Sequence, residues 1–160
     1  MNQFVNTEHS KRPIGENQEY KDVIEQISTE GICPFCPEHL HRFHPNPIDQ
    51  ETDYWVVTNN AYPYIGSTAH ALAIHKEHIE TIDDMEPDAW VDFLDVIKGA
   101  TKRLRLEGAS LLMRYGSTDY TGASVAHLHA QIVSGSGNPA DKPLLARLGN
   151  MLDEDLRDPN

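Results

Sequence analysis

The spacing of apolar residues along the chain predicts four β-strands. In the segment SVAHLHAQIV (124–133), every second position is apolar: Ala126, Leu128, Ala130 and Ile132. Because side chains alternate between the two faces of a strand, one face of this segment should be buried. Three other stretches alternate in the same way or are rich in β-branched and aromatic residues, so we also expect strands at 53–58, 68–74 and 109–115.

Apolar residues at helical spacing predict three helices. A short helix over 17–29 places Val23, Ile24 and Ile27 on its inner face, and Gly31 marks its end. The longest helix begins at Pro87 and ends before Gly108, because proline favours a first turn and glycine ends a helix. Its apolar face is expected to carry Trp90, Leu94, Ile97, Thr101 and Leu104. A C-terminal amphipathic helix is expected from Leu144, Leu145, Leu148, Leu152 and Leu156.

Successive strands with one long helix favour an α+β fold, in which the helix packs on one face of an antiparallel sheet. The 160 residues are enough for one domain with a substantial core. We divide the chain into a polar N-terminal arm with a short helix (1–30), a central domain that carries the candidate chemistry (31–134), and a loop with a C-terminal helix (135–160). Residues 1–15 are polar, and we expect them to be disordered.

The composition restricts the classes of partner. A net charge of −12 argues against non-specific binding to a nucleic-acid backbone, although a small nucleotide could still occupy a locally positive cleft. No apolar stretch approaches the roughly 20 residues of a membrane span, and the N-terminus lacks the apolar run of a signal peptide. Two cysteines without a secretory signal indicate a reducing compartment, so we expect a cytoplasmic protein.

The polar face of the 124–133 segment is the first candidate site. His127, His129 and Gln131 occupy alternate positions and should stand in a row on one face of the strand. Imidazole is a common base, nucleophile and metal ligand at neutral pH. The plain alternative is an exposed polar face, but Gly122 and Ser124 precede this strand and a second cluster lies upstream.

That second cluster contains the only two cysteines, Cys33 and Cys36, in a C-x-x-C motif. Two thiolates at this spacing can bind one zinc ion or form a redox pair. A redox pair usually opens a helix in a βαβ unit, whereas Pro34 and Pro37 indicate a loop here. Histidines downstream could complete a metal site, and one candidate set is His39, His41 and His44.

Together, these segments resemble the histidine triad superfamily. TGASVAHLHAQIV is similar to the signature strand of that family. LAIHKEHIETI resembles the strand-to-loop segment that usually reads Pro-Lys-x-His, with His75 in place of the proline and with Lys76 and His78 matching. NNAYPYIG and CPFC resemble two segments of the galactose-1-phosphate uridylyltransferase branch, its Asn-x-aromatic-Pro segment and its zinc-binding C-x-x-C. The ordered match runs from about Gly31 to Val133.

The resemblance implies a histidine triad fold with a structural zinc ion (Zn2+). The implied ligands are the two cysteines, the histidine of the Lys-x-His segment and the first histidine of the triad: Cys33, Cys36, His78 and His127. A closed set of four ligands of this kind is structural rather than catalytic.

The resemblance also implies the chemistry. His129 matches the nucleophile, which attacks an α-phosphorus and forms a nucleotidyl-histidine intermediate. Gln131 matches the third triad position, where many hydrolases carry histidine. An amide can bond a phosphoryl oxygen but exchanges no proton at neutral pH. Ser124 matches a phosphate-contacting loop, whose donors would stabilise developing charge.

The implied function is transfer of a nucleoside monophosphate by a nucleotidyltransferase or phosphorylase. Two alternatives are a hydrolase of the same family, acting on a phosphoanhydride or phosphoramidate, and a zinc-stabilised nucleotide-binding module without turnover. The expected partner is a small-molecule nucleotide, with no stable nucleic-acid or membrane partner. We also expect a homodimer, because histidine triad relatives commonly pair so that two sheets form one continuous sheet. The long helix carries Trp90 and Phe93, which could contribute to such a contact.

Several positions depart from the family pattern or have two interpretations. Arg114-Tyr115-Gly116 replaces the usual asparagine and glycine before the signature, and 134–137 replaces a Pro-Arg-Trp segment. Arg114 could supply positive charge to the substrate site or lie in solvent. Asn60 could bind a ribose or phosphate, or only form the turn. We expect His70 and His75 at the surface of the sheet.

Overall fold

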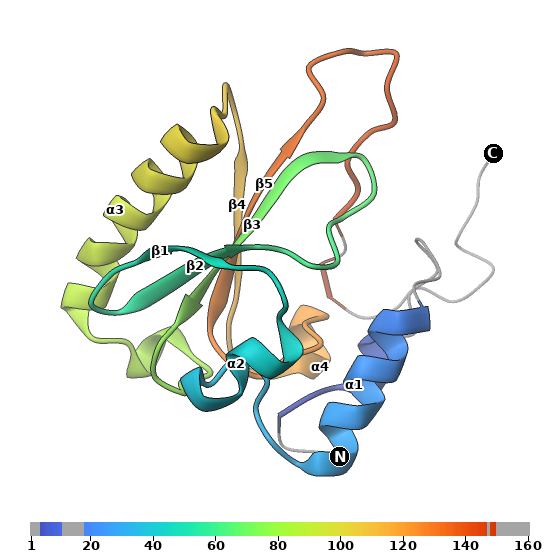
Figure 1. Ribbon diagram of the computed structural model, residues 1–160, viewed down its shortest axis with the longest axis vertical. Helices are drawn as coiled ribbons and strands as arrows, with labels where there is room; N and C mark the ends of the chain where they lie inside the picture. Colours follow the sequence, from blue (N-terminus) through green and yellow to red (C-terminus); the bar gives the residue numbers. More distant parts are fainter. Residues whose placement is uncertain (1–3, 11–17, 147, 150–160) are drawn as a thin grey trace.

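The computed structural model describes residues 4–10, 18–146 and 148–149, and its framework is a five-stranded antiparallel sheet (Figure 1). The strands are β1 (Ile48–Glu51), β2 (Trp55–Asn59), β3 (Ser67–His75), β4 (Ser110–Arg114) and β5 (His129–Gly135), in the order β1-β2-β3-β5-β4. The helices are α1 (Gln18–Glu30), α2 (Pro37–Phe43), α3 (Pro87–Leu104) and α4 (Thr118–Thr121), with 3-10 turns η1 (Thr7–Ser10) and η2 (Ile82–Asp84). The predicted α+β class is confirmed.

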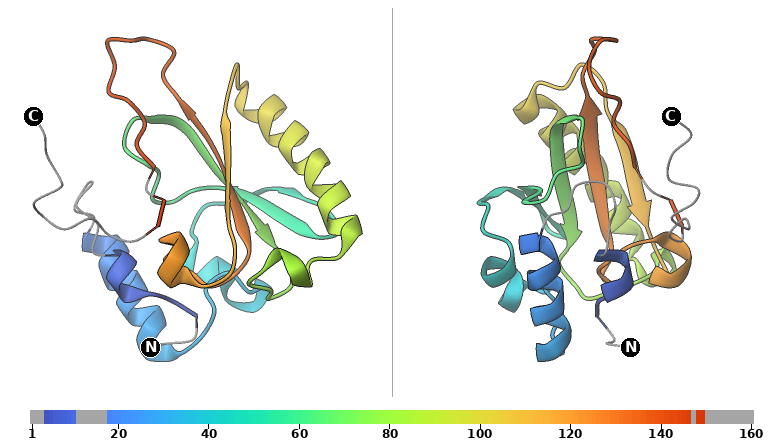
Figure 2. Two further views of the ribbon diagram at one scale, coloured as in Figure 1. Left: turned by 180° about the vertical axis from the view of Figure 1, so that it is seen from behind. Right: turned by 90° about the vertical axis from the view of Figure 1, so that its right-hand side faces the viewer.

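The long helix α3 covers one face of the sheet (Figure 2). Its buried residues are Ala89, Phe93, Val96 and Ala100. They pack against alternate positions of three central strands: Trp55, Val57, Ala71, Ala73, Ala130 and Ile132, with Leu128 just before β5. This apolar face is the one that the alternation in 124–133 predicts.

The predicted inner face of α3 is partly wrong. Ile97 and Leu104 pack against the core as predicted, but the centre of the buried face lies one position earlier than the sequence suggests. Trp90 and Leu94 are 55% and 53% exposed, whereas Ala89 and Phe93 are buried. The indole of Trp55 donates a hydrogen bond of 2.8 Å to the carbonyl of Ala89, which fixes the side of the helix that meets the sheet. Because Phe93 lies in the core, it cannot also serve the expected dimer contact, and the homodimer stays a prediction.

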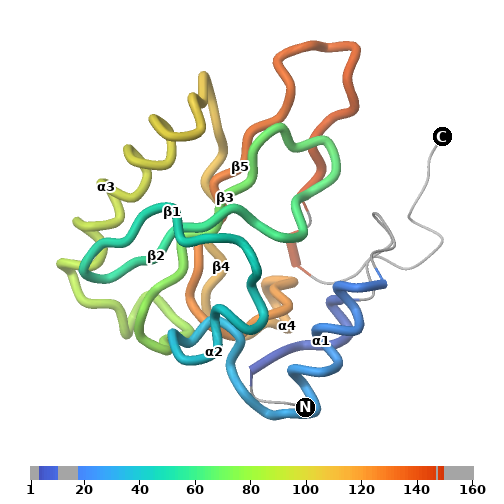
Figure 3. Tube along the Cα trace, viewed as in Figure 1, coloured from blue at the N-terminus to red at the C-terminus, as the bar shows by residue number. Residues whose placement is uncertain are grey.

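The opposite face of the sheet is covered by shorter elements. Leu40 of α2 packs against Leu72 and Ile74 of β3, and α1, α2 and α4 lie together at one end of the molecule (Figure 3). Both α2 and β1 lie between the C-x-x-C motif and the strand expected at 53–58, where the sequence predicts neither a helix nor a strand. On this face, His129 pairs with Ile74 of β3 and with Arg114 of β4, and Gln131 pairs with Leu72.

The described part of the N-terminal arm is ordered, which contradicts the expected disorder for residues 4–10; residues 11–15 lie outside the described chain. Val5 is buried and forms a bridge with Val125. The carbonyl of Phe4 accepts a hydrogen bond of 2.9 Å from the N–H of Ala126. The N–H of Leu128 bonds the carbonyl of Ile79 at 2.7 Å. The carbonyl of Leu128 still accepts the N–H of His75 of β3 at 3.1 Å, but the N–H groups of Ala126 and Leu128 bond other segments. The regular strand β5 therefore begins at His129 and not at Ser124.

The segment after β5 folds back along the molecule without a helix at 142–146 or 148–149. The C-terminal helix expected from Leu144 does not begin there, and Leu152 and Leu156 lie outside the described residues. The returning segment passes Gly66 so closely that a Cβ there would lie 2.7 Å from the carbonyl oxygen of Pro143. Gly66 has φ +83°, so glycine suits this position on both counts. In the described chain, every helix is too short or too polar to cross a lipid bilayer.

The correction to α3 can be tested by a pair of alanine substitutions. Val96→Ala removes two methyl groups from a fully buried site and should lower the free energy of unfolding by about 2 kcal/mol. Leu94→Ala removes a larger group from an exposed site and should change the free energy of unfolding by less than about 0.5 kcal/mol. Urea unfolding measures both. A larger loss for Leu94→Ala would contradict the observed helix face.

Candidate active site and metal centre

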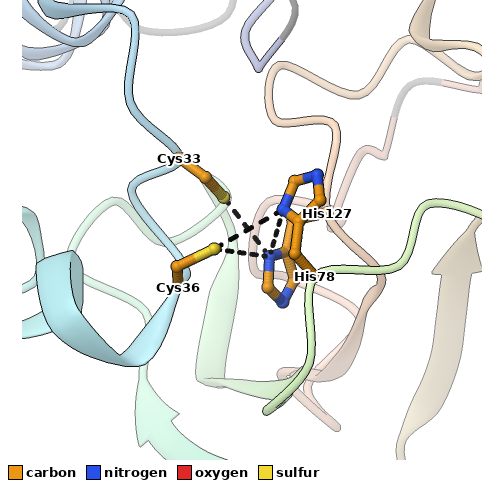
Figure 4. Close-up of side chains that lie close together, drawn as sticks. All are labelled: Cys33, Cys36, His78 and His127. Carbon is orange, nitrogen blue, oxygen red and sulfur yellow. Dashed lines mark hydrogen bonds between the residues drawn. The ribbon is translucent and has the colours of Figure 1, made fainter.

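Four side chains from three segments converge beside the start of β5 (Figure 4). Cys33 and Cys36 come from the loop between α1 and α2, His78 follows β3, and His127 precedes β5. The Cys33 Sγ lies 3.3 Å from the Nδ1 of His127, and the Cys36 Sγ lies 3.5 Å from the Nδ1 of His78. All four candidate ligand atoms lie within 4.8 Å of one another. The structure therefore brings together the four residues that the resemblance implied.

These distances suit one tetrahedral metal ion. Bonds of about 2.3 Å to sulfur and about 2.0 Å to nitrogen separate tetrahedral ligand atoms by roughly 3.3 to 3.8 Å. The two Nδ1 atoms are 3.2 Å apart, and the Cys36 Sγ is 3.9 Å from the Nδ1 of His127. The Nε2 of His127 donates to the carbonyl of His75 at 2.7 Å, so Nδ1 carries the lone pair that faces the cluster. The cluster could therefore hold a metal ion.

The protonation states at this cluster have a common cause. Burial lowers the pKa of His127 to about 4, so its ring is neutral and able to act as a ligand. Burial also raises the pKa of the Cys33 thiol and, together with the neighbouring Cys33, raises the pKa of Cys36 to about 12. A bound cation would reverse the effect on the thiols, because it stabilises thiolates.

His129 lies at the start of β5 with its ring oriented by the backbone. Its Nδ1–H donates a hydrogen bond of 2.7 Å to the carbonyl of His127. In the neutral ring, the lone pair is then on Nε2, the atom that can attack an electrophile. The ring is buried and lies edge-on to Phe35, with the ring centres 5.1 Å apart.

Gln131 is the next residue on the same face, and His70 of β3 determines the orientation of its amide. The backbone N–H of Tyr64 donates to the Nδ1 of His70 at 3.1 Å, so the neutral ring carries its proton on Nε2. That nitrogen lies 3.1 Å from the Oε1 of Gln131, which accepts the proton in a hydrogen bond, and the Nδ2 of Asn60 lies at the same distance from it. The NH2 group is therefore the part of the Gln131 amide that can reach a ligand.

A cavity of about 410 Å³ opens in front of these residues. Arg114, Ser124, His129 and Gln131 form its polar side. Its apolar side contains residues of α1, of the C-x-x-C loop and of the β2–β3 loop: Tyr20, Val23, Ile24, Phe35, Tyr62 and Tyr64. A predominantly apolar cavity with a few convergent polar groups is typical of a small-molecule site.

The structure also places the remaining candidates, each of which had two interpretations. The Nδ1–H of His39 donates to the carbonyl of Cys33 (3.1 Å), and His44 contacts Thr58 and the carbonyl of Asn59. His41 is exposed, so none of these three histidines joins the cysteine–histidine cluster. Arg114 is buried, which excludes the solvated interpretation. Asn60 lines the cavity, yet its Oδ1 also accepts the N–H of Tyr62 at 2.9 Å and forms the turn.

Sequence reasoning missed two contributors to this site. His70 was expected at the sheet surface, as was His75, but they are only 5% and 2% exposed. The sequence did contain a signal for His70. It lies two residues before Leu72 and four before Ile74, so its side chain is on the same face of β3 as theirs, which is the face of the site. The second contributor is α1, whose inner face lines the cavity. No sequence pattern indicated that this helix would lie over β5.

Comparisons with known proteins identify the fold. No family model and no curated protein matches the chain, but solved structures do. A structure described as "Hit Like Protein" matches 57% of this chain and 88% of its own, at 26% identity and a TM-score of 0.50. A histidine triad nucleotide-binding protein from Candida albicans matches 72% of this chain and 83% of its own, at 22% identity and a TM-score of 0.53. A zinc-bound histidine triad family protein from Mycobacterium smegmatis matches 72% and 81%, at 17% identity and a TM-score of 0.50. The chain thus has the histidine triad fold.

The role assigned to His70 predicts a specific loss of stability. His70→Ala removes the N–H that satisfies the buried Oε1 of Gln131, and it should lower the free energy of unfolding by about 1–3 kcal/mol. His41→Ala, on the exposed side of α2, is the matched control and should change the free energy of unfolding by less than about 0.5 kcal/mol. Chemical denaturation measures both, and equal effects would remove the basis for this orientation of Gln131.

Proposed function

We propose that this protein binds a nucleotide in the cavity and transfers its nucleoside monophosphate group through His129. The observation that carries the proposal is the hydrogen bond from the Nδ1 of His129 to the carbonyl of His127, 2.7 Å long. It directs the lone pair of the ring to Nε2 at the wall of the cavity, as a nucleophile requires. The α-phosphorus would bond to Nε2 and lose its leaving group, and an acceptor would then take the nucleotidyl group.

The neighbouring donors fit this reaction. The amide NH2 of Gln131 can bond a phosphoryl oxygen while His70 holds its carbonyl end. Ser124 lies in the cavity wall, and the N–H of Asn6 bonds its carbonyl at 2.9 Å, which holds the loop in place. The aromatic and aliphatic side of the cavity suits a flat base and ribose, with Asn60 beside it.

Gln131 favours transfer to an acceptor other than water. Hydrolysis of the intermediate needs a base that takes a proton from water, and an amide cannot do this. Phosphate or a phosphorylated sugar is already an anion and attacks without losing a proton to the enzyme. A hydrolase of the same fold and a nucleotide-binding module without turnover are the competing functions, and both are distinguished by the labelling experiment below.

We further propose that the four-residue cluster binds zinc in a structural role. Two thiols and two imidazoles form a ligand set that zinc prefers, and a closed set of four leaves no position for substrate. When bound, the metal would connect the C-x-x-C loop to the start of β5. That loop carries Phe35, which contacts His129 and lines the cavity.

Metal content and stability should change together. The purified protein should contain about one zinc ion per chain, and Cys33→Ser or His127→Ala should lose the metal and lower the thermal unfolding midpoint, because metal binding and folding are coupled. His41→Ala is the control, since this residue is exposed on α2 and lies outside the cluster. Metal analysis and calorimetry measure both quantities. A metal-free native protein, or a native disulfide between the cysteines, would refute the zinc proposal.

The nucleophile is tested by trapping the intermediate. Wild-type protein incubated with a labelled dinucleoside polyphosphate or nucleotide sugar should acquire one nucleotidyl group on His129. His129→Ala should lose the label and at least about 10³-fold of the turnover, with metal content unchanged. His41→Ala serves as the control, because this residue lies on the exposed side of α2.

The products separate the competing functions. Faster release of the label with inorganic phosphate or a sugar phosphate indicates transfer, and release that is independent of both indicates hydrolysis. Tight binding of the nucleotide without any label on the wild type would indicate a binding module. Full turnover by His129→Ala would show that the nucleophile is misassigned.

A further inference from the structure

His44 is a buried histidine in the cavity lining that the proposed reaction does not use. The residue is 6% exposed and lies at the point where α2 ends. Its Nε2 is 2.9 Å from the carbonyl oxygen of Asn59 and 3.1 Å from the Oγ1 of Thr58. The hydroxyl of Thr58 donates its own hydrogen to the carbonyl of Pro47 at 2.8 Å, so both neighbours of Nε2 are acceptors. The Nε2 of His44 therefore carries the ring proton.

The other ring nitrogen of His44 is an acceptor. Burial lowers the pKa of His44, so the ring is neutral at physiological pH and Nδ1 carries a lone pair. Within the described part of the chain, the side-chain hydrogen bonds of His44 all involve Nε2, and Nδ1 bonds no protein group. Nδ1 is also not among the polar atoms that are sealed from solvent without a partner. Its lone pair is thus available to a ligand in the cavity that brings a hydrogen-bond donor.

The register of the sheet relates His44 to the reacting group. Gln131 of β5 pairs with Leu72 of β3, and Leu72 pairs with Thr58 of β2, so these three side chains share the face of the sheet that carries the site. Two strand spacings separate Gln131 from Thr58, which is about 10 Å. His44 lies over Thr58 at the far end of this row, and Leu72 lines the cavity between them. A ligand with its phosphate at Gln131 would place the next group over Leu72 and in front of His44.

In a nucleoside monophosphate, that next group is the ribose, whose 2′- and 3′-hydroxyl groups can donate hydrogen bonds. The base would lie beyond the ribose, where the cavity is aromatic and the rings of Tyr20 and Tyr62 are 4.9 Å apart. Asn60 was the other candidate for the ribose, but its Oδ1 accepts the N–H of Tyr62 and its Nδ2 lies 3.1 Å from the Nε2 of His70. The lone pair of His44 is therefore the better acceptor for a ribose hydroxyl.

We propose that the Nδ1 of His44 accepts a hydrogen bond from the 2′- or the 3′-hydroxyl group of the ribose and makes the cavity selective for nucleotides that carry this hydroxyl. The inference rests on the proposed function, which places the phosphate at His129 and Gln131. A site that hydrogen-bonds a substrate hydroxyl rejects the analogue without it, because the buried acceptor then has no partner. His44 thus acts in binding and takes no part in the transfer step.

Two substitutions separate the role of His44 toward the ligand from its role in the fold. In His44→Gln, the amide nitrogen can replace Nε2 as the donor to Asn59, but no acceptor remains at the position of Nδ1. In His44→Asn, the amide oxygen can replace Nδ1, but the shorter side chain leaves the carbonyl of Asn59 without its donor. His41→Gln is the matched control, since His41 is exposed on α2.

The measurement is equilibrium binding, which needs no turnover. AMP, GMP, CMP and UMP are each compared with their 2′-deoxy and 3′-deoxy analogues by titration calorimetry. Wild type should bind one of the two deoxy series about 10-fold to 100-fold more weakly than the ribonucleotides it accepts. His44→Gln should reduce this ratio to less than about threefold, with a thermal unfolding midpoint within about 2 °C of wild type. His44→Asn should keep the ratio but lower the midpoint by about 5 °C, and His41→Gln should match wild type in both.

Two results would overturn the inference. One is a wild-type protein that binds both deoxy series as tightly as the ribonucleotides. The other is a His44→Gln variant that keeps the full ratio, and a changed order of the four bases in that variant would assign Nδ1 to the base instead. If His44→Gln does not fold, discrimination by wild type and its retention by His44→Asn decide the question.

Failure of the proposed function gives different results. If none of the four ribonucleotides binds wild type, the nucleotide site fails, and the role of His44 fails with it. If they bind with the expected ratio but His129 acquires no nucleotidyl group, the transfer reaction fails while the ribose contact of His44 is upheld.

Discussion

Two backbone carbonyls organise the whole candidate site. The carbonyl of His75 accepts the Nε2–H of His127, and the carbonyl of His127 accepts the Nδ1–H of His129, both at 2.7 Å. Because a neutral imidazole has one donor nitrogen and one acceptor nitrogen, each bond determines which nitrogen of that ring carries the lone pair. The first ring directs Nδ1 to the two cysteines and His78, and the second directs Nε2 to the cavity. Two histidines separated by one residue thereby face different groups, and a displacement of one would alter the orientation of the other.

This arrangement depends on interruption of the strand at the correct residue. From His129 onward the chain pairs with β3 and β4. Residues 125–128 bond mainly the N-terminal arm and the segment after β3, and only the carbonyl of Leu128 accepts a bond from β3, at the N–H of His75. The interruption releases His127 from the regular geometry of the sheet and lets its ring meet two cysteines that precede it by more than ninety residues. The N-terminal arm and the C-x-x-C loop therefore belong to the site, although neither is part of the sheet.

The polarity of the cavity is controlled by groups outside it. A backbone N–H can only donate, so the N–H of Tyr64 determines the tautomer of the His70 ring. His70 in turn determines which end of the Gln131 amide faces a ligand. On the other side, Tyr64 and Thr121 hold the guanidinium of Arg114 in position. A strongly acidic chain thus maintains a cavity whose described lining carries one permanent charge, and that charge is positive. Such preorganised donors act on developing negative charge without reorganisation during the reaction.

Patterns within a short stretch of sequence were enough to predict most of the regular elements. The runs at 53–58, 68–74 and 109–115 correspond to β2, β3 and β4, the alternation in 124–133 covers most of β5, and the pattern after Pro87 corresponds to α3. The resemblance predicted which cysteines and histidines would meet. Tertiary structure decided what depends on contacts between distant segments. It selected Ala89 over Trp90 as the inner face of α3, because the Trp55 indole bonds the Ala89 carbonyl. It placed α1 over the cavity, buried His70 against Gln131 and buried Arg114 beside His129. Local periodicity specifies which face of an element is apolar, whereas the partner of each buried polar group is fixed only when the strands pair in register.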